Sequence, residues 1–195
     1  RNKWITNKYS RARVHLIRSF HDCIITSSQT IIDDNPMLTC RINGLSKRSP
    51  SRIILDNKLM IPLNSKLIRN SSRYRTIIFY NKMNKKKIKI LKKLRIKSFK
   101  IPLTAKGNFN LHKVLIKIKN LGFSRIFLES GVKLTTSFLS DNLVDDFKLF
   151  ISNTKLGKNG DGNIKGYFRR FIGNKKSTTE KINLFGEELK SYKIK

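Results

Sequence analysis

Apolar residues occur along this chain in short unbroken runs that alternate with segments of helical spacing. An unbroken run of about five apolar residues predicts a strand buried on both faces, because a half-exposed strand would alternate with polar residues. The predicted strands cover residues 23–27, 51–56, 76–80, 98–102, 125–131 and 147–152, with an edge strand at 190–195.

Apolar residues three and four positions apart predict helices between these strands, at 10–20, 83–96, 111–121 and 133–140. Ser10 and Asn110 are predicted to cap the first and third helices, since short polar side chains accept hydrogen bonds from a helix's first turn. Alternating strands and helices predict an α/β fold with a largely parallel sheet and a late antiparallel portion. No internal repeat is present, so residues 1–195 are predicted to form a single domain.

Polar residues follow several of the predicted strands. In an open α/β sheet, ligands bind beyond the carboxyl ends of the strands. The segment after the first strand is expected to be a polar turn that holds Asp33 and Asp34, and Asp56 ends the second strand. The simpler interpretation of these three carboxylates is that they form turns by accepting hydrogen bonds from nearby backbone N–H groups.

Glu129, Ser130 and Gly131 form a small-residue junction between a strand and a helix. Such a junction offers backbone N–H donors and the positive end of the helix dipole to a phosphate group. The alternative is an ordinary turn, because the spacing is not GxGxxG. Arg18 and Arg41 are candidates for a phosphate clamp, and the alternative for each is a solvated surface arginine.

The formal net charge of +31 suggests nucleic acid at first sight. The lysines are nevertheless spread over the whole chain, and Ile, Asn and Lys are overused together, as an AT-biased genome would produce. Residues 82–93 form the one dense basic cluster, and their apolar positions favour a solvated amphipathic element over a nucleic-acid patch. Together with the absence of a nucleic-acid-binding motif, this argues against nucleic acid as a partner.

Cys23 and Cys40 lack CxxC spacing, and the three histidines lack the spacing of metal ligands. We therefore expect buried, reduced thiols of a cytoplasmic protein and no metal site. No apolar run approaches the roughly 20 residues that cross a bilayer, so no membrane partner is expected. The chain begins at Arg1 without a leader sequence, which suggests a fragment of a longer protein.

A family resemblance rests on a series of short motifs whose order and spacing are specific. They are Trp4-Ile-Thr, Ser10-Arg11, Val14-His15-x-x-Arg18, Asp22-x-Ile-x-Thr, Thr30-x-x-x-Asp34-x-Pro36-x-Leu38-x-x-Arg41, Arg52-Ile-Ile-Leu-Asp56, Phe127-Leu-Glu-Ser-Gly131, Phe138-Leu-x-x-x-Leu-Val-Asp145 and Lys155-Leu-Gly157. This set resembles the riboflavin-biosynthesis reductase domain, 5-amino-6-(5-phosphoribosylamino)uracil reductase, over roughly residues 3–158. In the family this domain forms the C-terminal half of a bifunctional pyrimidine deaminase/reductase.

The resemblance implies a three-layer α/β/α dihydrofolate-reductase-like fold with a mostly parallel mixed sheet. It also implies NADPH-dependent reduction of the substrate to 5-amino-6-(5-phosphoribitylamino)uracil, by hydride transfer to ribose C1′. The positions that match NADP contacts in the family are Trp4, Thr30, Asp34, Gly131, Val132, Lys133, Leu134, Thr135, Thr136 and Ser137. The positions that match substrate contacts are Asn2, Arg18, Leu38, Arg41 and Glu129. Asp34 and Glu129 are the candidate catalytic residues for assisting proton transfer.

The resemblance further implies a homodimer. The deaminase signature H-x-E…P-C-x-x-C does not occur in this sequence, which leaves two alternatives: a zinc-dependent deaminase fused upstream, or a free-standing reductase. Ser130 departs from the family's usual Glu-Gly-Gly, and residues 159–195 match poorly. One alternative function is another NADPH reductase of the same fold, acting on a pterin. An alternative of a different class is a basic nucleic-acid-binding protein.

Overall fold

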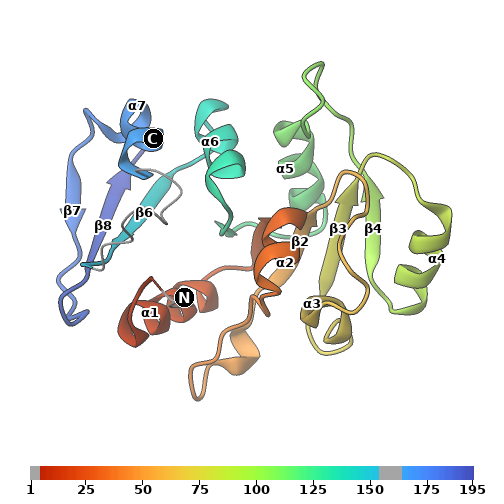
Figure 1. The fold of residues 1–195 in the computed structure, drawn as a ribbon, viewed down its shortest axis with the longest axis horizontal. Coiled ribbons are helices and arrows are strands. Elements are labelled where there is room, and N and C mark those ends of the chain that lie inside the picture. Colours follow the sequence, from red (N-terminus) through yellow and green to blue (C-terminus); the bar gives the residue numbers. More distant parts are fainter. Residues whose placement is uncertain (1–4, 154–163) are drawn as a thin grey trace. The chain divides into compact units, whose positions relative to one another are not determined.

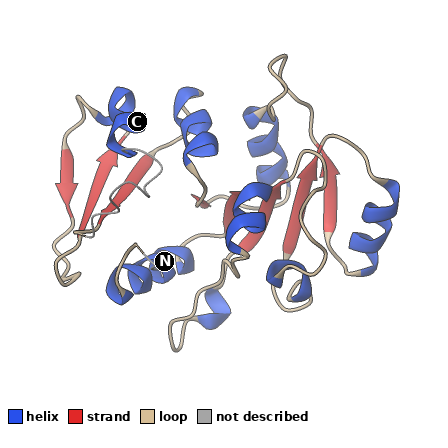
Figure 2. Ribbon diagram, viewed as in Figure 1, coloured by secondary structure: helices blue, strands red, loops and turns tan. Residues whose placement is uncertain are grey.

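The computed structural model describes residues 5–153 and 164–195, and the side chains of residues 164 and 165 are not described. The chain divides into two compact units. We call His15–Leu134 the parallel-sheet unit, and Arg1–Val14 with Thr135–Lys195 the antiparallel-sheet unit. Figure 1 labels the elements, and Figure 2 separates helices from strands. The single domain expected from the sequence stays a prediction.

The described elements follow one another along the chain in a largely alternating order. They are α1 (Lys8–Ser19), β1 (Cys23–Ser27), α2 (Ser28–Asp34), η1 (Ser46–Arg48), β2 (Ser51–Leu55), α3 (Lys66–Arg69), β3 (Thr76–Tyr80), α4 (Lys85–Lys93), β4 (Lys97–Lys100), α5 (Leu111–Asn120), β5 (Ile126–Leu128), α6 (Val132–Ser140), β6 (Asp146–Ile151), α7 (Ile164–Ile172), β7 (Ser177–Thr179) and β8 (Glu188–Lys193).

The parallel-sheet unit contains five parallel strands in the order β4-β3-β2-β1-β5. In register, Ile25 of β1 lies opposite Ile53 of β2 and Leu128 of β5. The strands predicted at 23–27, 51–56 and 76–80 are confirmed as β1, β2 and β3, which are almost entirely buried, whereas β4 and β5 are shorter than predicted and only partly buried. Burial on both faces is what a parallel strand in the middle of a sheet requires.

Helices cover both faces of this sheet. Successive side chains of a strand point to opposite faces. On one face, Ile24, Ile54 and Ile78 pack in a single cluster with residues of α2, α3 and α4. On the other face, Lys117 of α5 lies 4.1 Å above the centre of the Phe99 ring of β4. The parallel-sheet unit is therefore a three-layer α/β/α arrangement.

Each of the two longer helices of this unit, α4 and α5, begins at an asparagine cap. Asn110 caps α5 as expected, accepting a hydrogen bond from the N–H of Lys113 at 3.0 Å. The basic helix α4 is capped by Asn84 and buries Leu91 fully, while its lysines other than Lys87 are exposed. This exposure agrees with the solvated amphipathic element predicted for residues 82–93.

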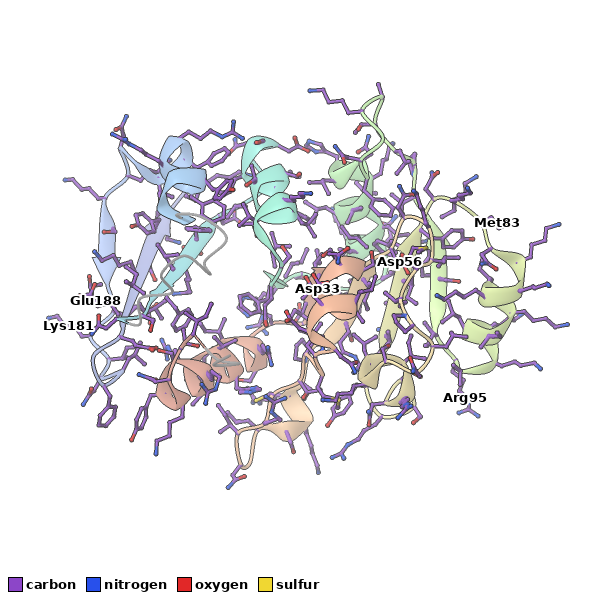
Figure 3. The ribbon with its side chains drawn as sticks, in the orientation of Figure 1. Asp33, Asp56, Met83, Arg95, Lys181 and Glu188 are labelled. Carbon is purple, nitrogen blue, oxygen red and sulfur yellow. The ribbon has the colours of Figure 1, made fainter. Side chains whose placement is uncertain are left out.

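Asp56 organises the turn that follows β2, where Figure 3 labels it. Its carboxylate is fully buried and accepts hydrogen bonds from the N–H groups of Met60, at 2.7 Å, and Ile61, at 3.0 Å. The ammonium group of Lys87 donates to the carbonyl oxygens of Leu59 and Ile61 in the same turn. The simpler interpretation of Asp56, as a turn former, is confirmed.

Arg52 is a fully buried cation on β2. Its guanidinium donates to the carbonyl oxygens of Met37, Leu67 and Tyr74 at 2.9 to 3.2 Å, and to Thr76 Oγ1 at 2.6 Å. Within the described residues it forms no ion pair, and burial lowers its pKa to about 10. A charge buried without a counterion is tolerated only where its donors are satisfied, as they are here.

The antiparallel-sheet unit contains three antiparallel strands in the order β6-β8-β7. The sequence was expected to end in an edge strand at 190–195, and this was wrong, because β8 pairs on both sides. Helix α7 was not predicted, and residues 154–163, which precede it, lie outside the described residues.

Helix α1 begins before the predicted Ser10, so the predicted cap was wrong. Asn7 caps the helix, because its Oδ1 accepts from the N–H groups of Tyr9, at 2.9 Å, and Ser10, at 3.0 Å. The Ser10 hydroxyl instead donates to Glu187, which also accepts from the N–H of Asn7 at 2.8 Å. These contacts attach the start of α1 to the turn before β8.

Two expectations about composition can be compared with the described residues. Cys23 and Cys40 are both buried and unpaired, and burial raises the pKa of the Cys23 thiol to about 12. The predicted buried thiols are thus confirmed. Among the helices that the structure describes, none has the length and apolarity needed to cross a membrane.

Replacing Arg52 with methionine should destabilise the protein by about 3 kcal/mol or more, because three buried carbonyl oxygens lose their donor at about 1–3 kcal/mol each. The free energy of unfolding in urea measures the loss. Arg48→Met is the control, since Arg48 is exposed and the same charge is removed. Equal losses in the two variants would show that the buried hydrogen bonds of Arg52 contribute nothing.

Candidate active site

The order of the parallel strands determines where a ligand site should lie. Strand β1 pairs with β2 on one side and β5 on the other, so the direction of the crossover connections reverses between β1 and β5. Ligands of open α/β sheets bind at the carboxyl ends of strands at such a reversal. The residues that follow β1 and β5 are therefore the first candidates.

The segment after β1 is the helix α2, where the sequence was expected to form a polar turn, and that expectation was wrong. Ser27 caps the helix by accepting a hydrogen bond from the N–H of Thr30 at 3.3 Å, and Ile31 anchors it in the core. Thr30 and Asp34 are four residues apart and share one face of α2. Asp33, which Figure 3 labels on α2, accepts from Gln29 at 2.7 Å.

The chain leaves α2 through a strained segment. Asn35 has a left-handed backbone, with φ of 45°, and its side chain accepts from the N–H of Lys66 at 2.8 Å. Leu38 is also left-handed, with φ of 53°, and its side chain is 1% exposed in the core. A left-handed leucine is uncommon and persists only where the surroundings enforce it. With its side chain in the core, Leu38 offers a ligand its backbone alone.

An ion pair joins α1 to the carboxyl end of β5. Arg18 donates from Nε to Glu129 Oε2 at 2.9 Å and from Nη2 to Glu129 Oε1 at 2.7 Å. Arg18 is 8% exposed, and the N–H of Glu129 continues the pairing of β5 with β1 by donating to Ile25 at 3.0 Å. Such bidentate pairs are the strong, geometrically specific ones.

The carbonyl oxygen of Thr39 joins three parts of the site. It accepts from Arg18 Nη1 at 2.9 Å and lies 2.8 Å from His15 Nδ1. A carbonyl oxygen is an acceptor, so His15 Nδ1 must carry a proton and donate. The two donors are 3.3 Å apart and share one acceptor. Both α1 side chains thus hold the segment that leads to Arg41.

His15 and Arg41 are both affected by the surrounding charges. Burial and the positive charges of Arg18 and Arg41 lower the pKa of His15, against a smaller opposite effect of Glu129. Partial burial and the charge of Arg18 likewise lower the pKa of Arg41. Arg41 is exposed and has no hydrogen bond or ion pair within the described part of the chain. It is the guanidinium that is free to receive an anion.

Gly131 lies between β5 and α6, and the space beside it is open. A Cβ built on Gly131 would meet no atom within 4 Å, and the glycine does not need a left-handed backbone. The first N–H groups of a helix have no intrahelical acceptor. Open space beside the start of α6 therefore fits a phosphate group of a nucleotide cofactor.

The other predicted site residues are placed as follows. Val132, Lys133 and Leu134 form the first turn of α6 in the parallel-sheet unit, whereas Thr135, Thr136 and Ser137 belong to the antiparallel-sheet unit. Thr136 Oγ1 is buried and has no hydrogen-bond partner in the structure. Trp4 and Asn2 lie outside the described residues.

The structure brings Arg18, Arg41 and Glu129 together, as the resemblance implied for the substrate site. His15 and the Thr39 carbonyl oxygen belong to the same cluster and were not predicted as site residues. His15 precedes Arg18 by three positions, which places both on one helix face. That spacing was the available signal in the sequence.

Comparisons with known proteins agree on one family. A family model described as the RibD C-terminal domain matches residues 1–189. The riboflavin biosynthesis protein RibD of Aquifex aeolicus is 34% identical over 191 residues, which is 96% of this chain and 50% of that protein. The chain thus spans half the length of that relative.

Two further relatives differ in how much of their length is matched. A Buchnera aphidicola protein named 5-amino-6-(5-phosphoribosylamino)uracil reductase is 26% identical over 170 residues, covering 80% of this chain and 77% of its own length. The structure of Acinetobacter baumannii RibD superposes with a TM-score of 0.74 at 20% identity, over 100% of this chain and 52% of that one. The dihydrofolate-reductase-like fold expected from the sequence is confirmed.

A double-mutant cycle should detect the Arg18–Glu129 pair in the free energy of unfolding. We expect Arg18→Met and Glu129→Gln to be coupled by about 1–2 kcal/mol, because the pair is bidentate and Arg18 is buried. The exposed pair of Lys193 and Asp146, whose N···O distance is 2.8 Å, is the matched control and should show no measurable coupling. Equal coupling in both cycles would contradict the geometry.

Proposed function

This chain belongs to the RibD C-terminal domain family, and from that membership we propose that it reduces 5-amino-6-(5-phosphoribosylamino)uracil with NADPH. The product would be 5-amino-6-(5-phosphoribitylamino)uracil, an intermediate of riboflavin biosynthesis. The observation that carries the proposal is the cluster of Arg18, Arg41 and Glu129 at the reversal point of the parallel sheet. It offers a phosphorylated sugar a free guanidinium beside a fixed ion pair.

Within this proposal, Arg41 is the principal phosphate ligand. Arg18 has five N–H donors, and three of them already bond Glu129 and Thr39, so one remains on each of Nη1 and Nη2. Arg18 can therefore add at most two further contacts while the ion pair stays intact, whereas, among the described residues, all five donors of Arg41 are available. This assigns unequal roles to the two arginines, whereas the sequence alone named both as candidates for a phosphate clamp without distinguishing them.

Glu129 is proposed to orient the substrate. Both of its oxygens accept hydrogen bonds from Arg18, and its side chain is still 31% exposed. A carboxylate held in this way can accept a further bond from a sugar hydroxyl or from the pyrimidine. Asp34 is exposed at the end of α2, and Asp34 and Glu129 stay the predicted residues for assisting proton transfer.

The proposed cofactor, NADPH, would lie along Thr30, Asp34 and the start of α6 after Gly131. When bound, its nicotinamide supplies the hydride that reduces C1′ of the sugar. The chain's own contribution is to bind both reactants, to orient them and to exclude water. Trp4 and the residues Val132 to Ser137 are proposed to share in cofactor binding, and Asn2 and the Leu38 backbone in substrate binding.

The family membership also supports finer proposals about the whole protein. We expect a cytoplasmic homodimer in which a zinc-dependent deaminase domain is joined to this one. Size-exclusion chromatography with light scattering measures the dimer, and sequencing the coding region before Arg1 tests the fusion.

Replacing Arg41 with methionine should raise KM for the phosphorylated substrate by about 10- to 100-fold, since a hydrogen bond between charged groups contributes about 1.5–3 kcal/mol. Steady-state oxidation of NADPH is the measurement. Arg48→Met, which removes the same charge from an exposed residue, should leave KM unchanged. An unchanged KM in Arg41→Met would refute the phosphate assignment, and competition by a folate would favour a pterin reductase.

Replacing Gly131 with valine should raise KM for NADPH by about tenfold or more, because the side chain would fill the space proposed for a cofactor phosphate. The fold should tolerate the change, since a Cβ there meets nothing within 4 Å. Thermal unfolding verifies the fold, and Gly131→Ala should give a smaller rise. If valine leaves KM for NADPH at the wild-type value, the cofactor phosphate does not bind beside Gly131.

A further inference from the structure

His15 lies beside the cluster of Arg18, Arg41 and Glu129 and has a basic nitrogen that no described hydrogen bond uses. Its Nδ1 is committed to the Thr39 carbonyl oxygen at 2.8 Å, which fixes the neutral ring with its proton on Nδ1. Its Nε2 then carries a lone pair, and this atom makes no hydrogen bond within the described residues. The ring is half-buried, on the same face of α1 as Arg18.

The charges around His15 come from three different elements. Arg18 lies on α1, Arg41 follows α2, and Glu129 follows β5. Two guanidinium groups face one carboxylate, so the cluster keeps one positive charge while His15 is neutral. A phosphate monoester carries up to two negative charges near neutral pH, because its second pKa is about 6. The cluster is one positive charge short of balancing a dianion.

We propose that His15 is the third ligand of the substrate-phosphate subsite and takes up a proton on Nε2 when a sugar phosphate binds. The inference rests on the proposed function, and it adds a residue and a pH dependence to that site. No covalent bond forms or breaks except Nε2–H, and the proton comes from solvent. His15 would supply the missing positive charge only while the anion is present.

The pH dependence follows from the direction of the pKa changes. In the free protein, burial and the two arginines lower the pKa of His15 below 6.5, so the ring is neutral at pH 7. A bound dianion offsets those arginines and raises the pKa. Binding then takes up a proton, and affinity increases as pH falls through the range between the bound and free values. The ligand's own titration acts in the opposite direction, so a variant must separate the two.

The test uses ribose 5-phosphate as the probe and His15→Asn as the variant. The amide nitrogen of asparagine can replace Nδ1 as donor to Thr39, while nothing replaces Nε2. We expect the affinity ratio of wild type to variant, measured by calorimetry, to rise about tenfold between about pH 8 and about pH 6. A ratio that does not change with pH would overturn the proposal.

A second measurement needs no variant, in case His15→Asn does not fold. The chain has three histidines, so NMR can follow the ring of each through a pH titration. Saturating ribose 5-phosphate should raise the pKa of His15, and it should leave the ring signals of His21 and His112 where they are without the ligand. His21 is a matched control, because its Nδ1 also lies near a backbone carbonyl oxygen, that of Ile17, at 2.7 Å.

The outcomes separate this inference from the proposed function. If the sugar phosphate raises the pKa of His15 but the protein does not reduce the proposed substrate, the subsite stands and the function fails. If the protein turns over the substrate while His15 titrates identically with and without the sugar phosphate, the function stands and the inference is wrong.

Discussion

The pairing of β1 with a parallel neighbour on each side is the constraint on which the site depends. Parallel strands place all their carboxyl ends at one edge of the sheet, so the chain after β1 and the chain after β5 must emerge there together. At the opposite edge, Asp22 accepts from the N–H groups of Ser124 and Arg125 at 2.9 and 2.8 Å, which fixes the start of β5 beside the start of β1. The location of the site is thus determined by backbone pairing before any particular side chain is considered.

The strands were predictable because their signal is local. The predicted ranges 23–27 and 76–80 coincide with β1 and β3, because the polar residues that flank an apolar run mark where the strand begins and ends. Helix α2 was not predictable in the same way. Its sequence, SQTIIDD, is polar at the start, β-branched in the middle and acidic at the end, all of which weaken helix propensity. The Ser27 cap and the burial of Ile31 outweigh that propensity, and the burial depends on tertiary structure, which the local sequence does not show. For β8 the missing information was the second pairing partner, which lies elsewhere in the chain.

The candidate site shows the same division between local and distant information. The resemblance identified Arg18 and Glu129 separately, but their pairing joins residues 111 positions apart. Neither sequence motif indicates that one arginine is committed to a carboxylate while the other is free. The role of the Thr39 carbonyl oxygen has no side-chain signature at all, because any residue supplies a carbonyl group. The overall charge of +31 contributes little to this picture, since the lysines of α4 other than Lys87 are exposed and Lys87 bonds carbonyl groups outside the cluster.

Arg52 has a consequence for how this sequence can change over generations. Its guanidinium donates hydrogen bonds to carbonyl groups from two separate chain segments. No other single side chain could donate to all of these carbonyl groups. An apolar residue could be accommodated only after the surrounding backbone had found other donors, which requires several substitutions together. Each intermediate on that route would be less stable than either end. An exchange of arginine for lysine, which keeps the charge but not the five donors, therefore meets a barrier at this position that it does not meet on the surface.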